Sequence, residues 1–205
     1  MGSGLTDGDH PGNGTVTRMY SPFAAAHDPT GHVVRWTTWD GEHVETVTIR
    51  WENEGFTVNG HVGRERVEYV LRLSPTWQVR QFILFRDLEE PDLWLATDGH
   101  GRWGEMNGSH RTELDGCYDI DLACTPFTNT LPIRRLPLHE GDSAELPVVY
   151  VDPETLEVRP VTQRYTRTAG HTWRYESVDT GYVTTFDVDE HGLVLDYPDE
   201  FRRVS

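Results

Sequence analysis

The chain has 205 residues, a length that suits one domain with a well-buried core. Hydrophobic residues make up 36% of the sequence and aromatic residues 11%, which excludes wholesale disorder. No run of about 18 apolar residues occurs, and the start, MGSGLTDGDHPGNG, lacks the basic flank and apolar stretch of a secretory signal. We therefore expect a soluble, cytoplasmic protein with no transmembrane segment.

The charge composition is acidic and lacks lysine. The sequence has 34 Asp and Glu against 18 basic residues, all of them Arg, and a formal net charge of −16. At molar salt the screening length falls to about 3 Å, which mutes repulsion within an acidic surface. This composition favours a halophilic protein, although codon bias toward Arg is an alternative explanation for the missing Lys. It argues against a nucleic-acid partner, which requires a basic face.

The hydrophobic pattern divides the chain into two parts. Residues 1–30 are rich in Gly and Pro and predict a flexible N-terminal arm, whereas residues 31–205 predict a single domain. From Val33 onward apolar residues alternate with polar ones, and turn dipeptides such as Asn59-Gly60 separate the alternating stretches. The domain is therefore expected to be mainly β and antiparallel.

Some of the predicted strands are apolar on both faces, which indicates two-sided burial. A strongly curved sheet around a core or cavity would explain this pattern, and so would a two-sheet sandwich. One segment, residues 125–136, interrupts the strands and predicts a short helix or an ordered loop. Thr125 suits the N-cap and Pro126 the first helical position, while Pro132 is expected to end the helix.

Asp119 and Asp121 are the first candidate site residues. In a strand they point to the same face, because side chains repeat every two residues. Two carboxylates on one face can act as an acid and base pair or hold a divalent cation. The structural alternative is that they pair with Arg134, Arg135 or loop amides and fix the loop.

Further candidates are polar or aromatic residues near this centre. Arg134 and Arg135 offer planar donors for carboxylate, phosphate or sugar hydroxyls, or else form structural ion pairs. Asn129 is expected either to cap loop amides or to contact a headgroup. A cavity could also be lined by a third set of residues, Gln163, Arg164, Tyr165 and Trp103.

Other kinds of chemistry find little support in the sequence. The ten His residues show no metal-ligand spacing, so no metal is expected. No serine-nucleophile elbow and no phosphate-binding glycine loop occurs, and no cofactor is expected. Cys117 and Cys124 predict buried free thiols.

Several of these segments together resemble a known family. They are LDGCYDIDL at 114–122, TPFTNTLPIRRL at 125–136, QRYT at 163–166, and the ending from Gly192 to Arg203. Residues 33–204 resemble the putative glycolipid-binding protein family, formerly a domain of unknown function. The resemblance implies a curved antiparallel half-barrel, similar in fold to lipoprotein carriers and mycobacterial glycolipid-carrying lipoproteins, with a helical lid over an apolar cavity.

Three functions follow from these observations. The first is non-enzymatic binding of a lipid or glycolipid, with acyl chains in the cavity and the headgroup held by Asn129, Arg134 and Arg135. The second is an enzyme that acts on a glycan or small acidic metabolite through Asp119 and Asp121. The third is a structural module with a filled core. The sequence does not determine the oligomeric state.

Overall fold

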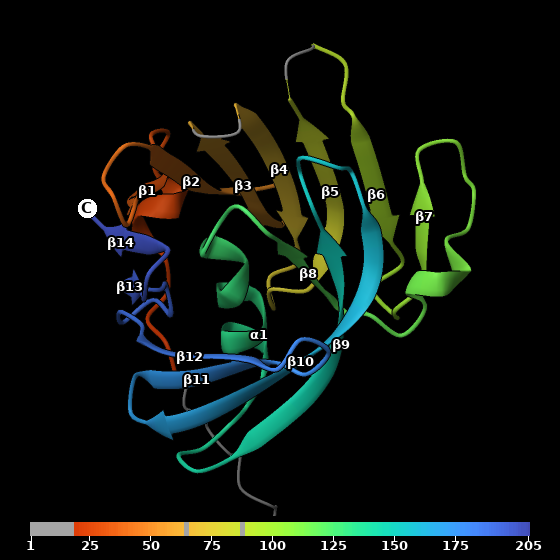
Figure 1. Cartoon of the computed structure of the whole chain (residues 1–205). Helices are drawn as coiled ribbons and strands as arrows, with labels where there is room; N and C mark the ends of the chain where they lie inside the picture. Colours follow the sequence, from red (N-terminus) through yellow and green to blue (C-terminus); the bar gives the residue numbers. More distant parts are fainter. Residues whose placement is uncertain (1–18, 64–65, 87–88) are drawn as a thin grey trace, which may run out of the picture.

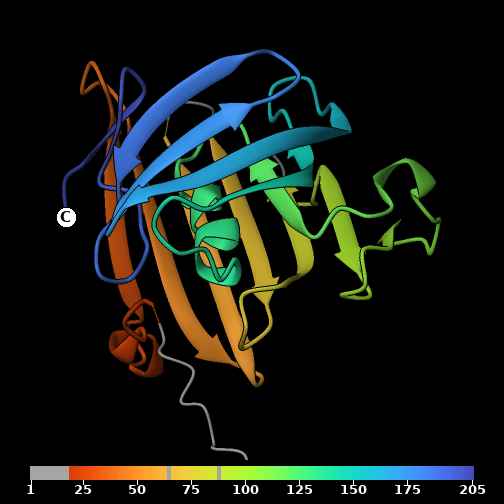
Figure 2. The ribbon, with the colours of Figure 1, turned by 90° about the horizontal axis from the view of Figure 1, so that it is seen from below.

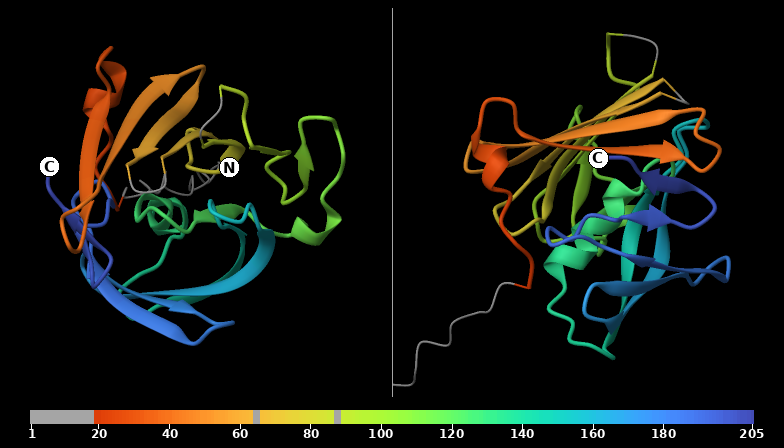
Figure 3. Two further views of the ribbon diagram at one scale, coloured as in Figure 1. Left: turned by 45° about the horizontal axis from the view of Figure 1, so that its top comes forward. Right: turned by 90° about the vertical axis from the view of Figure 1, so that its left-hand side faces the viewer.

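The structure is a computed structural model that describes residues 19–63, 66–86 and 89–205. Two β sheets face each other, and a short helical segment lies between them (Figure 1). Figure 3 shows the sheets diverging around this segment, with the carboxyl-terminal strands beside the start of the larger sheet. The expected mainly β fold with a curved half-barrel is confirmed.

The larger sheet has nine strands in the order β13-β14-β1-β2-β3-β4-β5-β6-β7, and all their pairings are antiparallel. Alternation places one face of each strand in the core, as in β2, where Val47 and Ile49 have no exposed surface. The strands are β1 (His32–Thr38), β2 (Val44–Glu52), β3 (Gly55–Val62), β4 (Val67–Leu73), β5 (Val79–Phe85), β6 (Leu93–Thr97), β7 (Trp103–Glu105), β13 (Asp196–Tyr197) and β14 (Phe201–Arg203).

The smaller sheet curls across the helical segment and has the order β12-β11-β10-β9-β8. One pairing differs from the expected antiparallel pattern, because β8 runs parallel to β9. The helical segment that follows β8 makes this possible, since a parallel pair needs a crossover connection. The strands are β8 (Asp119–Leu122), β9 (Ser143–Val151), β10 (Val158–Ala169), β11 (Thr172–Ser177) and β12 (Tyr182–Asp187).

The interior helical segment consists of the 3-10 turn η3 (Phe127–Asn129) and helix α1 (Thr130–Arg135). The predicted cap is displaced by one residue, because the N-cap of η3 is Pro126 and not Thr125. The Thr125 hydroxyl accepts the Phe127 N–H at 3.0 Å. The prediction that Pro132 ends the helix is wrong. This proline lies in the first turn of α1, where its missing N–H costs no hydrogen bond.

This segment sits in the middle of the molecule rather than on its surface (Figure 2). Phe127, Leu131 and Ile133 have no exposed surface, and their side chains join the core between the two sheets. Two further 3-10 turns lie outside the sheets, η1 (Ala24–His27) and η2 (Thr112–Leu114). The core therefore forms around the segment that also carries the candidate site residues.

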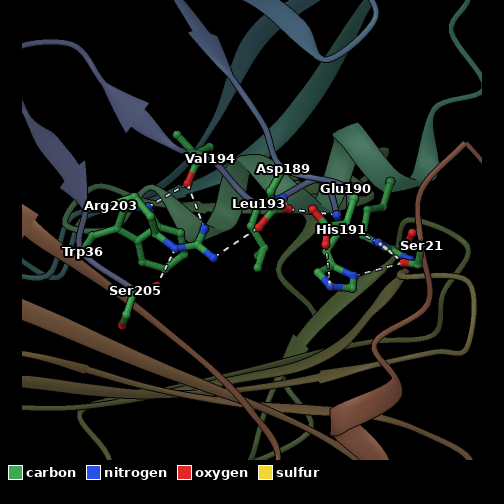
Figure 4. Close-up of polar contacts among 10 residues, drawn as sticks. Ser21, Trp36, Asp189, Glu190, His191, Leu193, Val194, Arg203 and Ser205 are labelled. Atoms are coloured by element: carbon green, nitrogen blue, oxygen red, sulfur yellow. Dashed lines mark hydrogen bonds and ion pairs between the residues drawn. The ribbon is translucent and has the colours of Figure 1, made fainter.

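The carboxyl-terminal loop is fixed by a network of polar contacts around Arg203 (Figure 4). The Arg203 guanidinium donates to the Val194 carbonyl at 3.2 Å and pairs with Asp189 at 3.1 Å. The Trp36 indole N–H donates to the same Val194 carbonyl at 2.9 Å. These contacts hold the loop before β13 against β1.

Residues 1–18 of the predicted N-terminal arm lie outside the described residues. Residues 19–30 pack on the domain, where Tyr20, Phe23 and Ala26 are buried. No helix within the described residues is long and apolar enough to span a membrane.

Candidate functional site

Asp119 forms an ion pair in the interior of the protein. Strand β8 directs it at α1, where Arg135 Nη2 lies 2.5 Å from Oδ2 and Nε lies 3.2 Å from Oδ1. The Asp119 side chain has no exposed surface, and burial raises the pKa of its carboxyl while Arg135 opposes the shift. This fork geometry fixes the end of α1 on the small sheet.

Asp121, two residues along the same face, meets neutral donors instead of a cation. The Thr128 hydroxyl donates to Asp121 Oδ1 at 3.0 Å, and Gln163 Nε2 donates to Oδ2 at 2.6 Å. Burial raises the pKa of the Asp121 carboxyl, whereas the hydrogen bonds from Thr128 and Gln163 lower it. The two aspartates therefore occupy different electrostatic environments.

The hydrogen bonds around Asp121 extend into a directed chain. The Tyr165 hydroxyl is within donor distance of Asn129 Oδ1, at 2.9 Å, and of Gln163 Oε1, at 3.3 Å. Asn129 Nδ2 in turn donates to the Pro126 carbonyl at 3.2 Å. Because Gln163 donates to Asp121, this carboxylate is the last acceptor of one branch, and the Pro126 carbonyl is the last acceptor of the other.

These groups form one wall of a pocket of about 300 Å³, which we call the tyrosine pocket. Asp121, Asn129, Gln163 and Glu200 are among its polar lining residues. Burial raises the pKa of the Glu200 carboxyl, and the charge of Asp121 adds to the shift. Its aromatic walls are Tyr150, Tyr175, Tyr182, Tyr197 and Phe201.

A second pocket of about 530 Å³ adjoins the first, because Ala123, Glu200 and Phe201 line both. We call it the adjoining pocket. Its apolar lining is made of Trp39, Val44, Val62, Ala123, Cys124 and Phe201.

A buried carboxylate, Glu45, also reaches the adjoining pocket. The hydroxyl of Tyr69 donates to Glu45 Oε1 at 2.9 Å and lies 3.4 Å from the Thr125 hydroxyl. Gly60 on β3 leaves room for this tyrosine, since a Cβ there would meet the Tyr69 ring at 2.1 Å.

The candidate residues do not all gather at one place. Asp121, Asn129 and Gln163 line the tyrosine pocket. The Tyr165 hydroxyl lies within hydrogen-bond distance of Asn129 and Gln163. Arg134 lies at the opposite end of α1, over the Trp77 ring at 4.5 Å. The sequence analysis thus grouped side chains that line two different pockets.

Two of the candidates lie away from both pockets. Arg164 points outward from β10 and pairs with Glu145 and Glu176. Trp103 is buried, and its indole N–H donates to the Cys117 carbonyl at 2.8 Å. Strand alternation could have separated Arg164 from its neighbours, because Gln163 and Tyr165 face inward.

Sequence reasoning missed most of the aromatic lining of the tyrosine pocket. Tyr175 on β11 and Tyr182 on β12 were not among the candidates, and neither were Tyr197 and Glu200. Alternation could have predicted that Tyr175 faces inward. Nothing in the local pattern places Tyr197 and Glu200 beside β8, because that proximity depends on how the two sheets pack.

Comparisons with known proteins agree with this fold. The family model described as "Putative glycolipid-binding" matches residues 33–203. A crystal structure of a DUF1089 family protein from Pseudomonas aeruginosa is similar, with a TM-score of 0.69 and 34% sequence identity, covering 82% of this chain and 92% of that chain. No curated protein matches the sequence. The chain thus belongs to the Putative glycolipid-binding family.

Proposed function

We propose that this protein binds a glycolipid without transforming it, with the sugar in the tyrosine pocket and part of the lipid in the adjoining pocket. The observation that carries the proposal is that the two pockets adjoin, since Ala123, Glu200 and Phe201 line both. An amphiphile needs a site that offers both polar groups and apolar surface. In the adjoining pocket the apolar surface comes from Trp39, Val44, Val62 and Phe201, beside the carboxylates of Asp40, Glu45, Asp199 and Glu200.

The polarity of the tyrosine pocket suits a ligand with many hydroxyl groups. Asp121 accepts hydrogen bonds from Thr128 and Gln163, and a carboxylate has further lone pairs for hydroxyl donors. Tyr175 and Tyr197, whose ring centroids are 6.5 Å apart, add broad aromatic surfaces with polar ends. Sugar rings offer both hydroxyl donors and apolar C–H faces to such a wall.

The two alternative functions have less support. An acid and base mechanism through Asp119 and Asp121 requires both carboxylates to reach the substrate, and the Asp119 side chain is completely buried beneath Arg135. A structural module with a filled core would not need pockets of about 300 and 530 Å³ between its sheets and loops.

The test is organic extraction of the purified protein in molar KCl, followed by mass spectrometry of the extract. We expect one glycolipid class at close to one molecule per chain, and none with an unrelated protein of similar acidity. Asp121→Asn is expected to weaken rebinding of that lipid by roughly tenfold, because it removes a charged acceptor.

Glu68→Gln is the matched control for Asp121→Asn, since Glu68 is exposed on β4 and lines neither pocket. A protein that carries no lipid and binds no offered glycolipid would contradict the proposal. Equal losses of binding in Asp121→Asn and Glu68→Gln would also contradict it, because the tyrosine pocket would then have no specific role.

We further propose that the protein works in a salt-rich cytoplasm. The support is its net charge of −16 together with the absence of Lys. Thermal unfolding in increasing KCl tests this, and we expect the melting temperature to rise up to molar salt as repulsion is screened. A melting temperature that is independent of KCl would contradict it.

A further inference from the structure

The tyrosine pocket holds more negative charge than its own arginine balances. Three carboxylates line it, those of Asp121, Asp179 and Glu200, against one guanidinium, that of Arg159. Arg159 Nε already pairs with the Glu157 carboxylate at 3.1 Å. Because this positive charge is compensated by a partner of its own, the pocket presents a net negative charge to a ligand.

Asp121 lacks the cationic partner that other enclosed aspartates of this protein have. Asp92, Asp119 and Asp189 expose at most 14% of their side chains, and each pairs with an arginine. Within the described residues, half-buried Asp121 accepts only its two hydrogen bonds from neutral donors. Its negative charge is thus left uncompensated, and both oxygens keep lone pairs for further donors.

Glu200 brings a second uncompensated carboxylate to the same pocket. The Tyr182 hydroxyl donates to Glu200 Oε1 at 3.2 Å, and no Arg or His in the described part of the chain pairs with this carboxylate. Burial and the charge of Asp121 both raise the pKa of Glu200, so the two anions act on each other. A cation that binds to both would relieve this repulsion.

Aromatic rings of the pocket add a second attraction for a cation. The Tyr175 ring centroid lies 6.3 Å from that of Tyr182 and 6.5 Å from that of Tyr197, and the planes are inclined by 58° and 59° rather than stacked. A cation within about 6 Å of such a ring is attracted by its electron-rich face. The same lining already shows this contact, because the Arg159 guanidinium lies 4.9 Å from the centroid of Tyr150.

The Tyr175 hydroxyl is an unsatisfied polar group in this pocket. Tyr175 is only 8% exposed, and its hydroxyl makes no hydrogen bond within the described residues, in contrast to those of Tyr165 and Tyr182. Burial raises the pKa of Tyr175, so the group stays a neutral hydroxyl whose oxygen can accept an N–H. A ligand that donates to it would recover the free energy that the missing hydrogen bond costs.

From this arrangement we propose that the tyrosine pocket selects a positively charged amino group, so that the glycolipid headgroup is an amino sugar. The inference rests on the proposed function and names its ligand class. The three N–H donors of a primary ammonium match in number the three acceptors, Asp121, Glu200 and the Tyr175 hydroxyl. A quaternary ammonium has no N–H to donate to them, and an anionic headgroup would be repelled by the carboxylates.

Three octyl glycosides test the role of the charge. They are octyl β-D-glucopyranoside, its 2-amino-2-deoxy analogue, and the N-acetyl derivative of that amine, of which only the amine is cationic. Their affinities are measured by isothermal titration calorimetry in molar KCl, below the critical micelle concentrations. Molar salt suppresses general attraction to the acidic surface, whereas a partly buried ion pair is screened less.

We expect the amine to bind roughly tenfold more tightly than either neutral glycoside, at one molecule per chain. Equal affinities for the three octyl glycosides would overturn the inference and leave glycolipid binding intact.

The pocket carboxylates are tested with Asp121→Asn and Glu200→Gln, each of which removes one negative charge. Both variants are expected to lower the preference for the amine over the glucoside from roughly tenfold to about threefold. Glu68→Gln removes an exposed carboxylate outside the pocket and is expected to keep the full preference. If the wild-type preference persisted in both pocket variants, the amino group would not be recognised in this pocket, and the inference would fail.

Tyr175→Phe keeps the aromatic ring and removes the unsatisfied hydroxyl. It is expected to weaken binding of the amine by about threefold. The melting temperature of the unliganded protein should not change, because no hydrogen bond within the described residues is lost. A lower melting temperature with unchanged affinity would contradict the inferred role of Tyr175.

The methyl glycoside of the same amino sugar separates this inference from the glycolipid proposal, because it has the headgroup without the octyl chain. We expect it to bind more weakly than the octyl amine. Equal affinities of the methyl and octyl amines would contradict glycolipid binding, while the selection of an amino group would stand. If no octyl glycoside bound, both proposals would be overturned.

Discussion

The two ends of the η3 and α1 segment face opposite kinds of chemistry. At its start, Thr128 and Asn129 belong to a network of neutral donors around Asp121, beside a pocket lined by tyrosines and carboxylates. At its end, Arg134 lies over aromatic rings in a groove whose described lining has no carboxylate. The two ends of one short segment therefore meet different surroundings.

The buried aspartates show the same contrast. Asp119 is compensated by the full charge of Arg135, whereas Asp121 is compensated by the dipoles of Thr128 and Gln163. A charged partner occupies both oxygens of the Asp119 carboxylate, while the neutral donors leave lone pairs on the Asp121 oxygens that can accept further hydroxyl groups. The ion pair is thus enclosed beneath Arg135, whereas the Asp121 network lines a pocket.

The largest expected effect comes from breaking the ion pair at the end of the segment. Arg135→Ala leaves the Asp119 carboxylate buried without its cation, and we expect a loss of about 3 to 5 kcal/mol in the free energy of unfolding. Chemical denaturation measures it. The double variant Asp119→Leu with Arg135→Met is expected to recover much of the loss, because it removes the stranded charge. No recovery would mean that the pair is not the cause.

A smaller effect is expected at the start of the segment. Gln163→Leu removes the donor to Asp121 and one acceptor of Tyr165, and we expect a loss of about 1 to 3 kcal/mol in the free energy of unfolding. Gln81→Leu is the control, since Gln81 is half-buried and makes no side-chain hydrogen bond within the described part of the chain. Equal destabilisation by both changes would refute the role of the network.

The pH dependence of stability should distinguish Glu200, which lines the tyrosine pocket, from Asp92, which pairs with Arg86. The pKa of Glu200 is raised by burial, with Tyr182 opposing the shift and Asp121 and Asp199 adding to it. A carboxyl with a raised pKa keeps its proton to higher pH in the folded state, so it costs stability as pH rises above its unfolded pKa of about 4.3.

Glu200→Gln is therefore expected to be more stable relative to the wild-type protein at pH 7 than at pH 4. Denaturant titrations of both proteins across this range measure the difference. A relative stability that does not change with pH would contradict the raised pKa. Asp92, whose pKa is lowered by Arg86, has the opposite sign, so Asp92→Asn should lose stability relative to wild type as pH rises.

The smallest effect is expected on the outer face of β10, away from both ends of the η3 and α1 segment. Arg164 lies on the outer face of β10, where Glu145 and Glu176 pair with it in solvent. Arg164→Gln should therefore leave unfolding and lipid binding unchanged within the precision of calorimetry and titration, because exposed ion pairs contribute little. A clear loss of glycolipid binding would show that the outer face takes part in recognition.

Local patterns in the sequence predicted much of the fold. The alternation of apolar and polar residues from Val33 onward predicted strands with one buried face, as β2 has. Thr125 and Pro126 predicted a helical segment, which begins at Phe127. The parallel pairing of β8 with β9 was not predictable from these patterns, since alternation carries no information on strand direction. Pro132 misled the prediction because a proline in the first turn of a helix looks the same in sequence as one that ends it.

The candidate site, like the fold, was predicted from the sequence only in part. The sequence by itself determined that Asp119 and Asp121 share a face, because the two-residue repeat of a strand requires it. Only the tertiary structure decided that one aspartate meets Arg135 and the other meets Gln163, and that Arg134 faces a different opening from Asn129. Those contacts join residues distant in sequence, and sheet packing around the interior segment, rather than any local preference, brings them together.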